Sequence, residues 1–483
     1  MSEHSGAKRE MGLFHTIMVG LNGALGINIF ILLDHAITLA GPSILLSILL
    51  CGALTFFIML SYCELGTLIP EVGGEYTFAK VAFGGPVAFM TGWVIIVGTV
   101  FGAALASLGF AYFINYYIPI DVHLAAAAII VLVAVTSIFK LRRMEVFIVF
   151  AFIAIFAIFI LLGIIQDVKP DLSFTMPNGI FGTLSATVFL YNLFFGVRAI
   201  IASGSEVKNP EKNIPRAIFI SIAILTAIYF AITYIIIAVA PLGSDVPGSL
   251  LTYTAEFLMG DLGRLVITFA GLFASLMSLT TFILIQTSVI TALGRDRYLP
   301  SFFLSRHKRF GTHHISIVMG SLLTLVFVVT GVVEIIGYAS SFMALLAFIA
   351  VNLSLMKMRT ENPHAKRPFK VLFYPYVPIA GIILAIISIL FAERISVIIG
   401  LVLLSIGLVA YYFRMIGYLR FRIAIGGMNV GIGLLIIASV TLFRDKIVEF
   451  IRVVGPTDIL INFLYLIGAV TVIAGMMNIA AKE

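Results

Sequence analysis

The sequence is poor in charge. Asp, Glu, Lys and Arg make up only 11% of its 483 residues, whereas hydrophobic residues make up 61%, and the mean hydropathy is +1.15. Water-soluble domains carry about 25% charged residues, so this deficit excludes a soluble globular protein. Most of the surface must face hydrocarbon, and the composition therefore predicts an all-helical protein that crosses a lipid bilayer many times.

Cysteine and long polar stretches are also scarce. Cys51 and Cys63, the two cysteines, are separated by about 18 Å if their apolar segment is helical, which excludes a disulfide between them. The longest polar connections, near 241–263, 294–313 and 357–370, are too short to fold as domains. Any functional site must therefore lie within or between membrane helices.

Long uncharged runs are what the sequence has in abundance. Runs of at least about 18 residues predict fourteen membrane spans, at 13–40, 43–69, 84–119, 122–139, 144–165, 178–203, 214–241, 264–293, 314–333, 335–356, 371–391, 395–413, 421–443 and 456–480. The net charge of +7 does not indicate a nucleic-acid partner, because membrane proteins gather Lys and Arg in their cytoplasmic loops for topological reasons.

The positions of the positive charges predict an orientation. If both termini lie in the cytoplasm, the cytoplasmic segments hold 23 of the 30 Lys and Arg residues and the external loops hold six. This bias follows the positive-inside rule, and it supports the span count, because one missed span would scramble the alternation. We therefore expect a multi-pass protein of the cell membrane with two cytoplasmic termini. The remaining cation, Arg198, falls inside the sixth span.

The first and sixth spans both carry residues that weaken a helix at mid-bilayer. The sixth contains the run 192–198, N-L-F-F-G-V-R, and the first contains three glycines and two asparagines, at Gly20, Asn22, Gly23, Gly26 and Asn28. Unwound backbone in matching spans of two half-repeats points to a transporter site, because it is tolerated only where it lines a cavity or is buried. Close packing of helices through small residues is the alternative, and the combination of both spans favours unwinding.

Four short motifs lie in order between residues 20 and 300. They are GINIF with AGP (26–30 and 40–42), ELG, P, GGEY and FG (64–66, 70, 73–76 and 83–84), EVKNP with IPRA (206–210 and 214–217), and RD with LP (295–296 and 299–300). Together they resemble the signatures of the amino acid-polyamine-organocation superfamily of secondary transporters. The last two predicted spans exceed the usual twelve of that superfamily, although some of its branches have fourteen.

The resemblance implies a fold and an activity. The fold would be like that of the bacterial leucine transporter, with a ten-helix inverted-repeat core of five plus five helices (13–357), a cytoplasmic head (1–12) and two sets of accessory helices (358–415 and 416–483). The activity would be that of a permease, without a cofactor or metal, that moves amino acids or related amines by symport or antiport through alternating access. The substrate would lie near the bilayer centre, against spans one, three, six and eight.

The resemblance also implies how the substrate is held. Free amides at Ile27 and Asn28 would take its carboxylate, because a helix N-terminus has unsatisfied donors and partial positive charge. Carbonyls released at Asn22 and Gly23, and around Asn192 and Leu193, would accept its ammonium group. The predicted substrate-binding residues are Asn22, Gly23, Gly26, Ile27, Asn28, Asn192, Leu193, Phe194, Phe195, Gly196 and Arg198.

Three of these positions depart from the family pattern. Asn28 stands where a second glycine is usual, and Asn192 replaces a gate aromatic whose place Tyr191, Phe194 or Phe195 could take. Arg198 stands where an acidic residue is usual, and an arginine within a span costs about 2.5–3.5 kcal/mol on insertion scales. Either Arg198 meets a carboxylate of the substrate, or backbone carbonyls with Glu64 or Glu206 satisfy it; we favour the second interpretation.

The coupling ion is left open between H⁺ and Na⁺. Ser275, Ser278 and Thr281 recur every three residues on one face of the eighth span, where a sodium site of the family kind would use them with carbonyls of the first span. Hydroxyls in membrane helices more often bond their own backbone or a neighbouring helix. His15 and His35 are candidate proton carriers, although both lie near the ends of their span.

Two other classes of function fit the sequence less well. A membrane-embedded enzyme, such as an acyl or lipid transferase, would need a catalytic cluster near one interface, yet His307, His313 and His314 stand among basic residues without nearby carboxylates. A channel-like facilitator would be expected to reveal a polar filter or a repeated subunit segment, and the sequence has neither. We therefore expect a transporter and not an enzyme.

Overall fold

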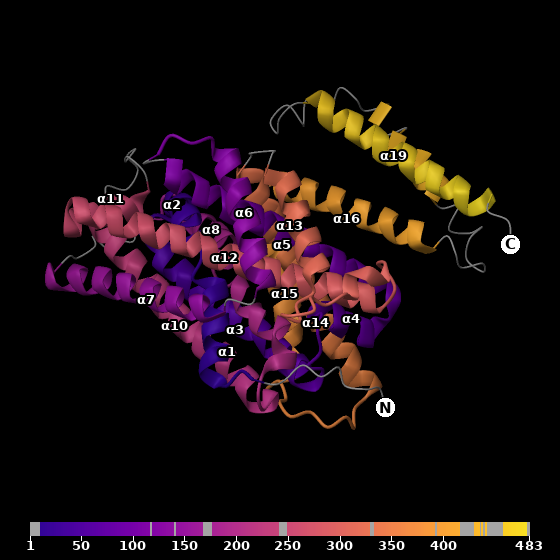
Figure 1. Ribbon diagram of the computed structural model, residues 1–483, viewed down its shortest axis with the longest axis horizontal. Helices are drawn as coiled ribbons and strands as arrows, with labels where there is room; N and C mark the ends of the chain where they lie inside the picture. The colour runs from indigo at the N-terminus through magenta and orange to yellow at the C-terminus, as the bar shows by residue number, and fades with distance from the viewer. Residues whose placement is uncertain are drawn as a thin grey trace. The chain divides into compact units, whose positions relative to one another are not determined.

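The computed structural model describes residues 10–115, 118–139, 142–167, 176–240, 249–328, 333–391, 394–415, 429–434, 436–437, 440–441 and 457–480. Their regular structure is helical, apart from one isolated parallel β-bridge between Met11 and Val207 (Figure 1). The chain forms two compact units, Met1–Val397 and Ile398–Glu483. The residues singled out by the sequence all belong to the first unit.

The described residues form a series of helices along the chain. In chain order, the α-helices and 3₁₀ helices (η) are α1 (Leu13–Ala24), α2 (Asn28–Ala40), η1 (Gly41–Ser43), α3 (Ile44–Leu68), α4 (Glu75–Phe83), α5 (Gly85–Asn115), α6 (Val122–Ile138), α7 (Arg142–Ile165), α8 (Gly179–Leu190), η2 (Tyr191–Leu193), η3 (Phe195–Arg198), α9 (Ala199–Ala202), η4 (Gly204–Glu206), α10 (Pro210–Val239), α11 (Leu250–Met259), α12 (Asp261–Arg295), η5 (Ser301–Leu304), α13 (His314–Val328), α14 (Val333–Glu361), α15 (Tyr376–Phe391), α16 (Arg394–Met415) and α19 (Thr457–Ala480).

Eight stretches of the described residues are helical, long and apolar enough to cross a membrane. They are Leu13–Phe30, Leu32–Leu68, Gly85–Asn115, Val146–Ile165, Gly179–Ala202, Pro210–Val239, Asp261–Arg295 and Phe342–Glu361. Five more of the predicted spans coincide with apolar helices of 10–17 residues. The predicted span 421–443 lies largely outside the described residues, and the total of fourteen spans stays a prediction.

Helix α5 lies at the centre of the first unit. It packs against α12 and α14 and also contacts α4, α6 and α13 (Figure 1). Glycines on α5 allow this close packing: a Cβ at Gly98 would lie 2.9 Å from the Cβ of Met343 in α14, and one at Gly102 would lie 2.6 Å from the ring of Phe282 in α12. Lipid supplies no hydrophobic driving force between membrane helices, so their association depends on van der Waals packing, which small residues allow at close range.

The GGEY motif forms the start of α4, a nine-residue helix too short to be found as a membrane span. Gly73 and Gly74 have φ angles of +111° and +48°, a region that strongly favours glycine. The hydroxyl of Tyr76 donates to Asp296 at the end of α12, at 2.6 Å, and Lys80 forms an ion pair with the same carboxylate. Burial, together with the hydrogen bond to Asp296, raises the pKa of Tyr76, so its hydroxyl remains a donor. These contacts fix α4 to α12.

Candidate functional site

The predicted interruption of the first span is present. Helix α1 ends at Ala24 and α2 begins at Asn28. The last α-helical bond runs from the N–H of Leu25 to the carbonyl of Leu21, and the amide of Gly26 turns back to the carbonyl of Ala24, at 2.7 Å each. The unwound residues are therefore 25–27, and the chain at 22–23 still belongs to the last turn of α1.

The predicted interruption of the sixth span is present as well. Helix α8 ends at Leu190, and the 3₁₀ segments η2 and η3 follow, separated by Phe194. The short helix α9 then begins at Ala199. Because 3₁₀ helices seldom run beyond three or four residues and hold their hydrogen bonds less well, the span changes its backbone form over about two turns at the run that the sequence singled out.

The two interruptions touch through their backbones. A Cβ built on Gly196 would lie 1.9 Å from the carbonyl carbon and oxygen of Gly23, and a Cβ on Gly23 would lie 2.4 Å from the carbonyl oxygen of Gly196. Rigid backbone atoms cannot move aside as the end of a side chain can, so the approach of η3 to α1 needs glycine on both sides. Two residues that are 173 positions apart in the sequence thus form the contact at the centre of the site.

Tyr229 of α10, which the sequence analysis did not single out, joins the two interruptions. Its hydroxyl lies 2.5 Å from the carbonyl oxygen of Ala24 and 3.2 Å from that of Leu193. A hydroxyl has one proton, so it donates to one of the two carbonyls at a time. Leu193 is among the positions predicted to offer a carbonyl, whereas in the first span the carbonyl that Tyr229 meets is that of Ala24 and not that of Asn22 or Gly23. In the sequence, an aromatic residue inside an apolar span cannot be distinguished from a lipid-facing residue or a residue of the core.

Two of the three hydroxyls predicted for an ion site lie against the first interruption. The N–H of Ile27 donates to Ser278 Oγ, and the side-chain amide of Asn22 donates to Thr281 Oγ1, at 3.1 Å each. Asn22 Oδ1 is buried and accepts no hydrogen bond from the described residues. Ser275 instead donates to the carbonyl of Gly271 in its own helix. The Ile27 amide, predicted to take a carboxylate, is therefore held by Ser278.

The remaining predicted residues lie at or beside the interruptions. Asn28 is the first residue of α2 and is buried, and the rings of Phe194 and Phe195 are buried too. Phe194 makes an edge-on contact with Tyr229, and Phe195 packs near Phe282. Asn192 lies in η2, and its side chain is outside the described residues. Gly26 allows no side chain without movement, because a Cβ there would lie 1.9 Å from Ser278 Oγ.

Arg198 has a different partner from the predicted ones. Its Nη1 lies 3.2 Å from Glu75 Oε1, at the start of α4, and both side chains are at most 5% exposed. The guanidinium carbon lies 3.3 Å from the centre of the Phe195 ring, a cation–π contact. The expectation that Glu64 or Glu206 would satisfy this arginine is therefore wrong, because the carboxylate in its ion pair belongs to Glu75.

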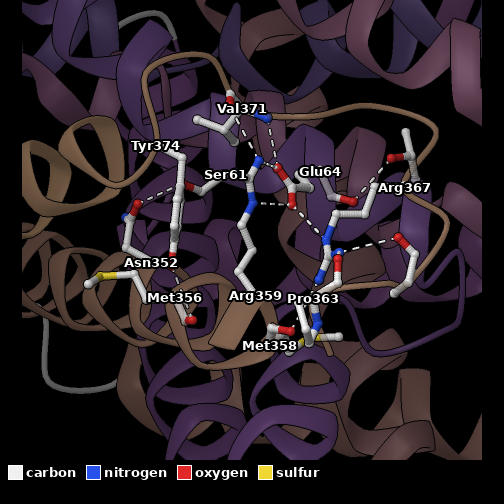
Figure 2. A network of polar contacts seen from close by, with 12 residues as sticks. Ser61, Glu64, Asn352, Met356, Met358, Arg359, Pro363, Arg367, Val371 and Tyr374 are labelled. Carbon is white, nitrogen blue, oxygen red and sulfur yellow. Dashed lines mark hydrogen bonds and ion pairs between the residues drawn. The ribbon is translucent and has the colours of Figure 1, made fainter. Parts of the chain in front are cut away.

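Glu64 is engaged elsewhere (Figure 2). The Nε of Arg359 donates to its Oε1 at 2.8 Å and the Nη2 of Arg359 donates to its Oε2, so the two groups form a bidentate pair. The backbone N–H of Val371 donates to Oε2 at 2.7 Å, and Arg367 adds an ionic contact at 3.1 Å. Glu64, which is fully buried, thus ties the end of α3 to α14 and to the segment that follows it.

The described residues hold no group of three or more His, Cys, Asp or Glu side chains arranged to bind a metal. What they bring together instead is backbone: two interrupted helices in contact inside a chain of long apolar helices. Unwound backbone buried at the meeting point of two membrane helices is the arrangement that polytopic membrane transporters have at their sites.

Comparison with known proteins agrees with this class. The family model for amino acid permeases matches residues 11–421, and the chain belongs to this family, within the amino acid-polyamine-organocation superfamily. It is a transporter, not an enzyme, and family membership implies a fold like that of the bacterial leucine transporter.

Three relatives from Bacillus subtilis show the range of similarity. The branched-chain amino acid permease BcaP is 26% identical over 84% of this chain and 92% of its own length. A methylthioribose transporter is 25% identical over 79% of this chain and 88% of its own length. The serine/threonine exchanger SteT is 27% identical over 85% of this chain and 98% of its own length.

Proposed function

We propose that this permease moves amino acids across the cell membrane by alternating access around the two interrupted helices. The observation that carries the proposal is the backbone contact between Gly23 and Gly196, beside the gaps in both helices. Movement of α1 with η3 against the rest of the core would open the site to one side and then to the other. Inverted-repeat transporters place their substrates at such broken helices.

The substrate headgroup is read by backbone at these gaps. The amides that open α2, at Ile27 and Asn28, take the substrate carboxylate, and Ser278 gives up the Ile27 amide when the substrate arrives. The carbonyls of Ala24 and Leu193 accept the ammonium group when the Tyr229 hydroxyl turns away. Backbone recognition selects the amino acid headgroup and leaves the side chain to the rings of Phe194 and Phe195.

The topology proposed for the whole chain has fourteen spans, both termini in the cytoplasm and a five-plus-five inverted-repeat core over 13–357. The excess of Lys and Arg in the segments on one side supports this orientation. Helices 358–415 and 416–483 are accessory in this scheme. Cysteines placed singly in the loops, with labelling from each side of a sealed vesicle, test it.

The transport is coupled to Na⁺ or H⁺. Asn22 Oδ1, Ser278 Oγ and Thr281 Oγ1 are oxygen ligands of the kind a hard cation prefers, and Asn22 Oδ1 has no partner among the described residues. A sodium ion at this place would also compensate the loss of the Ser278 contact to Ile27. Uptake driven by an imposed Na⁺ gradient, compared with uptake driven by a pH gradient, decides between the two ions.

The proposed substrates are small neutral amino acids. The headgroup site fits every amino acid, and the relatives named for branched-chain amino acids and for serine and threonine span aliphatic and hydroxyl side chains. Purified protein in proteoliposomes preloaded with isoleucine, valine, serine or threonine should show saturable counterflow of the labelled compound. Counterflow of none of them, with counterflow of methylthioribose instead, would overturn the proposed substrate class.

A further inference from the structure

Arg198 is a buried cation, and two of its three side-chain nitrogens have no acceptor among the described residues. Its side chain is 1% exposed, and only Nη1 faces a carboxylate, that of Glu75. Nε and Nη2 are buried and donate to none of the described residues. Phe195 covers one face of the guanidinium, and its ring satisfies the charge in part but accepts no strong hydrogen bond. Buried donors without acceptors are rare in proteins and each needs an explanation.

The unmatched donors form one edge of the guanidinium. Nε and Nη2 point in the same direction, and together they match the two oxygens of a carboxylate. The same molecule shows this use of the edge: Arg359 binds both oxygens of Glu64 through its Nε and Nη2. At Arg198 the Glu75 carboxylate is instead reached from Nη1, through a single oxygen at 3.2 Å, so the better edge is left without an acceptor.

The location of Arg198 connects this edge with the substrate path. Arg198 ends η3, two residues beyond the Gly196 that touches Gly23, and its guanidinium is stacked on Phe195 of the same turn. An anion bound to the edge would therefore lie beside the second interruption. Glu75 already neutralises the arginine, so an added group of zero net charge keeps the site neutral. A zwitterion satisfies this condition, whereas a simple anion or a simple amine does not.

We infer that the Nε and Nη2 edge of Arg198 binds the carboxylate of a zwitterionic amino acid on its way through the protein, with Glu75 as the residue that positions the guanidinium. The inference rests on the proposed transport of amino acids. It adds a second binding site for the substrate carboxylate to the one proposed at the start of α2. Glu75 holds Nη1, and the hydroxyl of Tyr62 lies 3.4 Å from the same Glu75 oxygen. The substrate carboxylate and Glu75 thus occupy different edges of one arginine.

Lysine at position 198 tests the claim, because it keeps the charge and loses the fork. Calorimetric titration of detergent-purified protein with L-isoleucine, or with whichever amino acid gives wild-type counterflow, should show binding weakened about ten- to one-hundred-fold in Arg198→Lys, the worth of a charge-assisted hydrogen bond. Arg359→Lys is the matched control, because its edge is filled by Glu64; it should lower the thermal midpoint and leave the affinity within twofold. Equal affinity of wild type and Arg198→Lys, both monodisperse, would overturn the inference.

A second variant decides the matter if Arg198→Lys fails to fold. Glu75→Gln keeps the shape of the side chain and an oxygen that can accept from Nη1, and it removes a negative charge that repels the substrate carboxylate. The affinity for the amino acid should therefore rise at least threefold, and the affinity for its amide should not rise. An unchanged affinity for both ligands would show that Arg198 has no substrate role. Wild-type counterflow, measured in the same preparation, separates these outcomes from failure of the proposed function.

Discussion

Two pairs of arginine and glutamate with buried carboxylates lie in the first unit, and they differ in how completely they are formed. Arg359 holds Glu64 through two nitrogens, and Val371 and Arg367 occupy what remains of the carboxylate. Arg198 meets Glu75 through one nitrogen and leaves the other donors unmatched. Both oxygens of Glu64 are occupied, so the first pair joins helices, whereas the unmatched donors of Arg198 are what the proposed substrate contact uses.

The surroundings of the two pairs agree with this difference. Arg367 also donates to the carbonyls of Met358 and Asn362, which closes the end of α14 (Figure 2). Ser61, which lies about one turn before Glu64 in α3, donates to the side chain of Asn352 in α14 and adds another hydrogen bond between these helices. The Arg198 pair joins α4 to the interrupted η3, whose backbone has left the α-helical form. The complete pair, Arg359 with Glu64, thus joins continuous helices, whereas the incomplete pair, Arg198 with Glu75, lies at a broken one.

Removal of the Glu64 carboxylate should have the largest effect on stability. Glu64→Ala leaves the guanidinium groups of Arg359 and Arg367 without their shared anion, and breaking a buried pair by removing one partner costs about 3–5 kcal/mol. We expect a large fall in the thermal midpoint measured by detergent-solubilised fluorescence unfolding, or loss of monodisperse protein. A thermal midpoint within one or two degrees of the wild type would contradict the role of this pair as a fastening.

Ligand stabilisation should separate the two arginines next. At an amino acid concentration of one hundred times its Kd, wild-type protein gains about 2.7 kcal/mol of stability, and a tenfold weaker site gains about half of that. Arg359→Lys should start from a lower thermal midpoint and show the full wild-type increase with ligand. Arg198→Lys should show the reduced increase. The comparison fails if both variants respond to ligand alike.

The smallest effect is expected at Tyr62. Its hydroxyl contacts Glu75 at 3.4 Å, at the long limit of a hydrogen bond, so Tyr62→Phe should cost less than about 1 kcal/mol. The affinity for the amino acid, measured by calorimetric titration, should change by no more than threefold. A loss of tenfold or more would mean that Tyr62, and not only Glu75, positions the guanidinium.

The sequence predicts the broken helices because their cause is local. Glycine and asparagine at the centre of an apolar span weaken the helix where they stand, and both interruptions lie at the predicted runs. The register differs slightly, since the gap comes at 25–27 and the backbone at 22–23 remains helical. Helix α1 continues through Asn22 and Gly23 although both have low helix propensity, because η3 packs against it at Gly196.

The partners across the site could not be predicted, because they depend on how distant helices pack. Glu75 lies 123 residues before Arg198, and Arg359 lies 295 residues after Glu64, so no spacing along the chain relates them. Arg359 and Arg367 fit the positive-inside rule as cytoplasmic loop residues, so the sequence offers no reason to pair them with Glu64. The contact of Tyr229 with Ala24 could not be predicted either, because nothing in the apolar span 214–241 distinguishes this tyrosine from its neighbours.

Counterflow by variants at Gly26 is the most direct test of the claim that the substrate site lies at the interrupted helices. Any side chain there meets Ser278 Oγ at 1.9 Å and displaces it from the Ile27 amide. Gly26→Val should abolish counterflow of the transported amino acid in proteoliposomes while the protein stays monodisperse, and Gly26→Ala should reduce it.

The steric cause can be checked in the same assay. Ser278→Ala, added to Gly26→Ala, removes the colliding oxygen and should restore counterflow to the level of Ser278→Ala alone. Gly12→Ala, which meets no atom within 4 Å, should transport as the wild type does. Normal counterflow by Gly26→Val would contradict the account and place the substrate elsewhere.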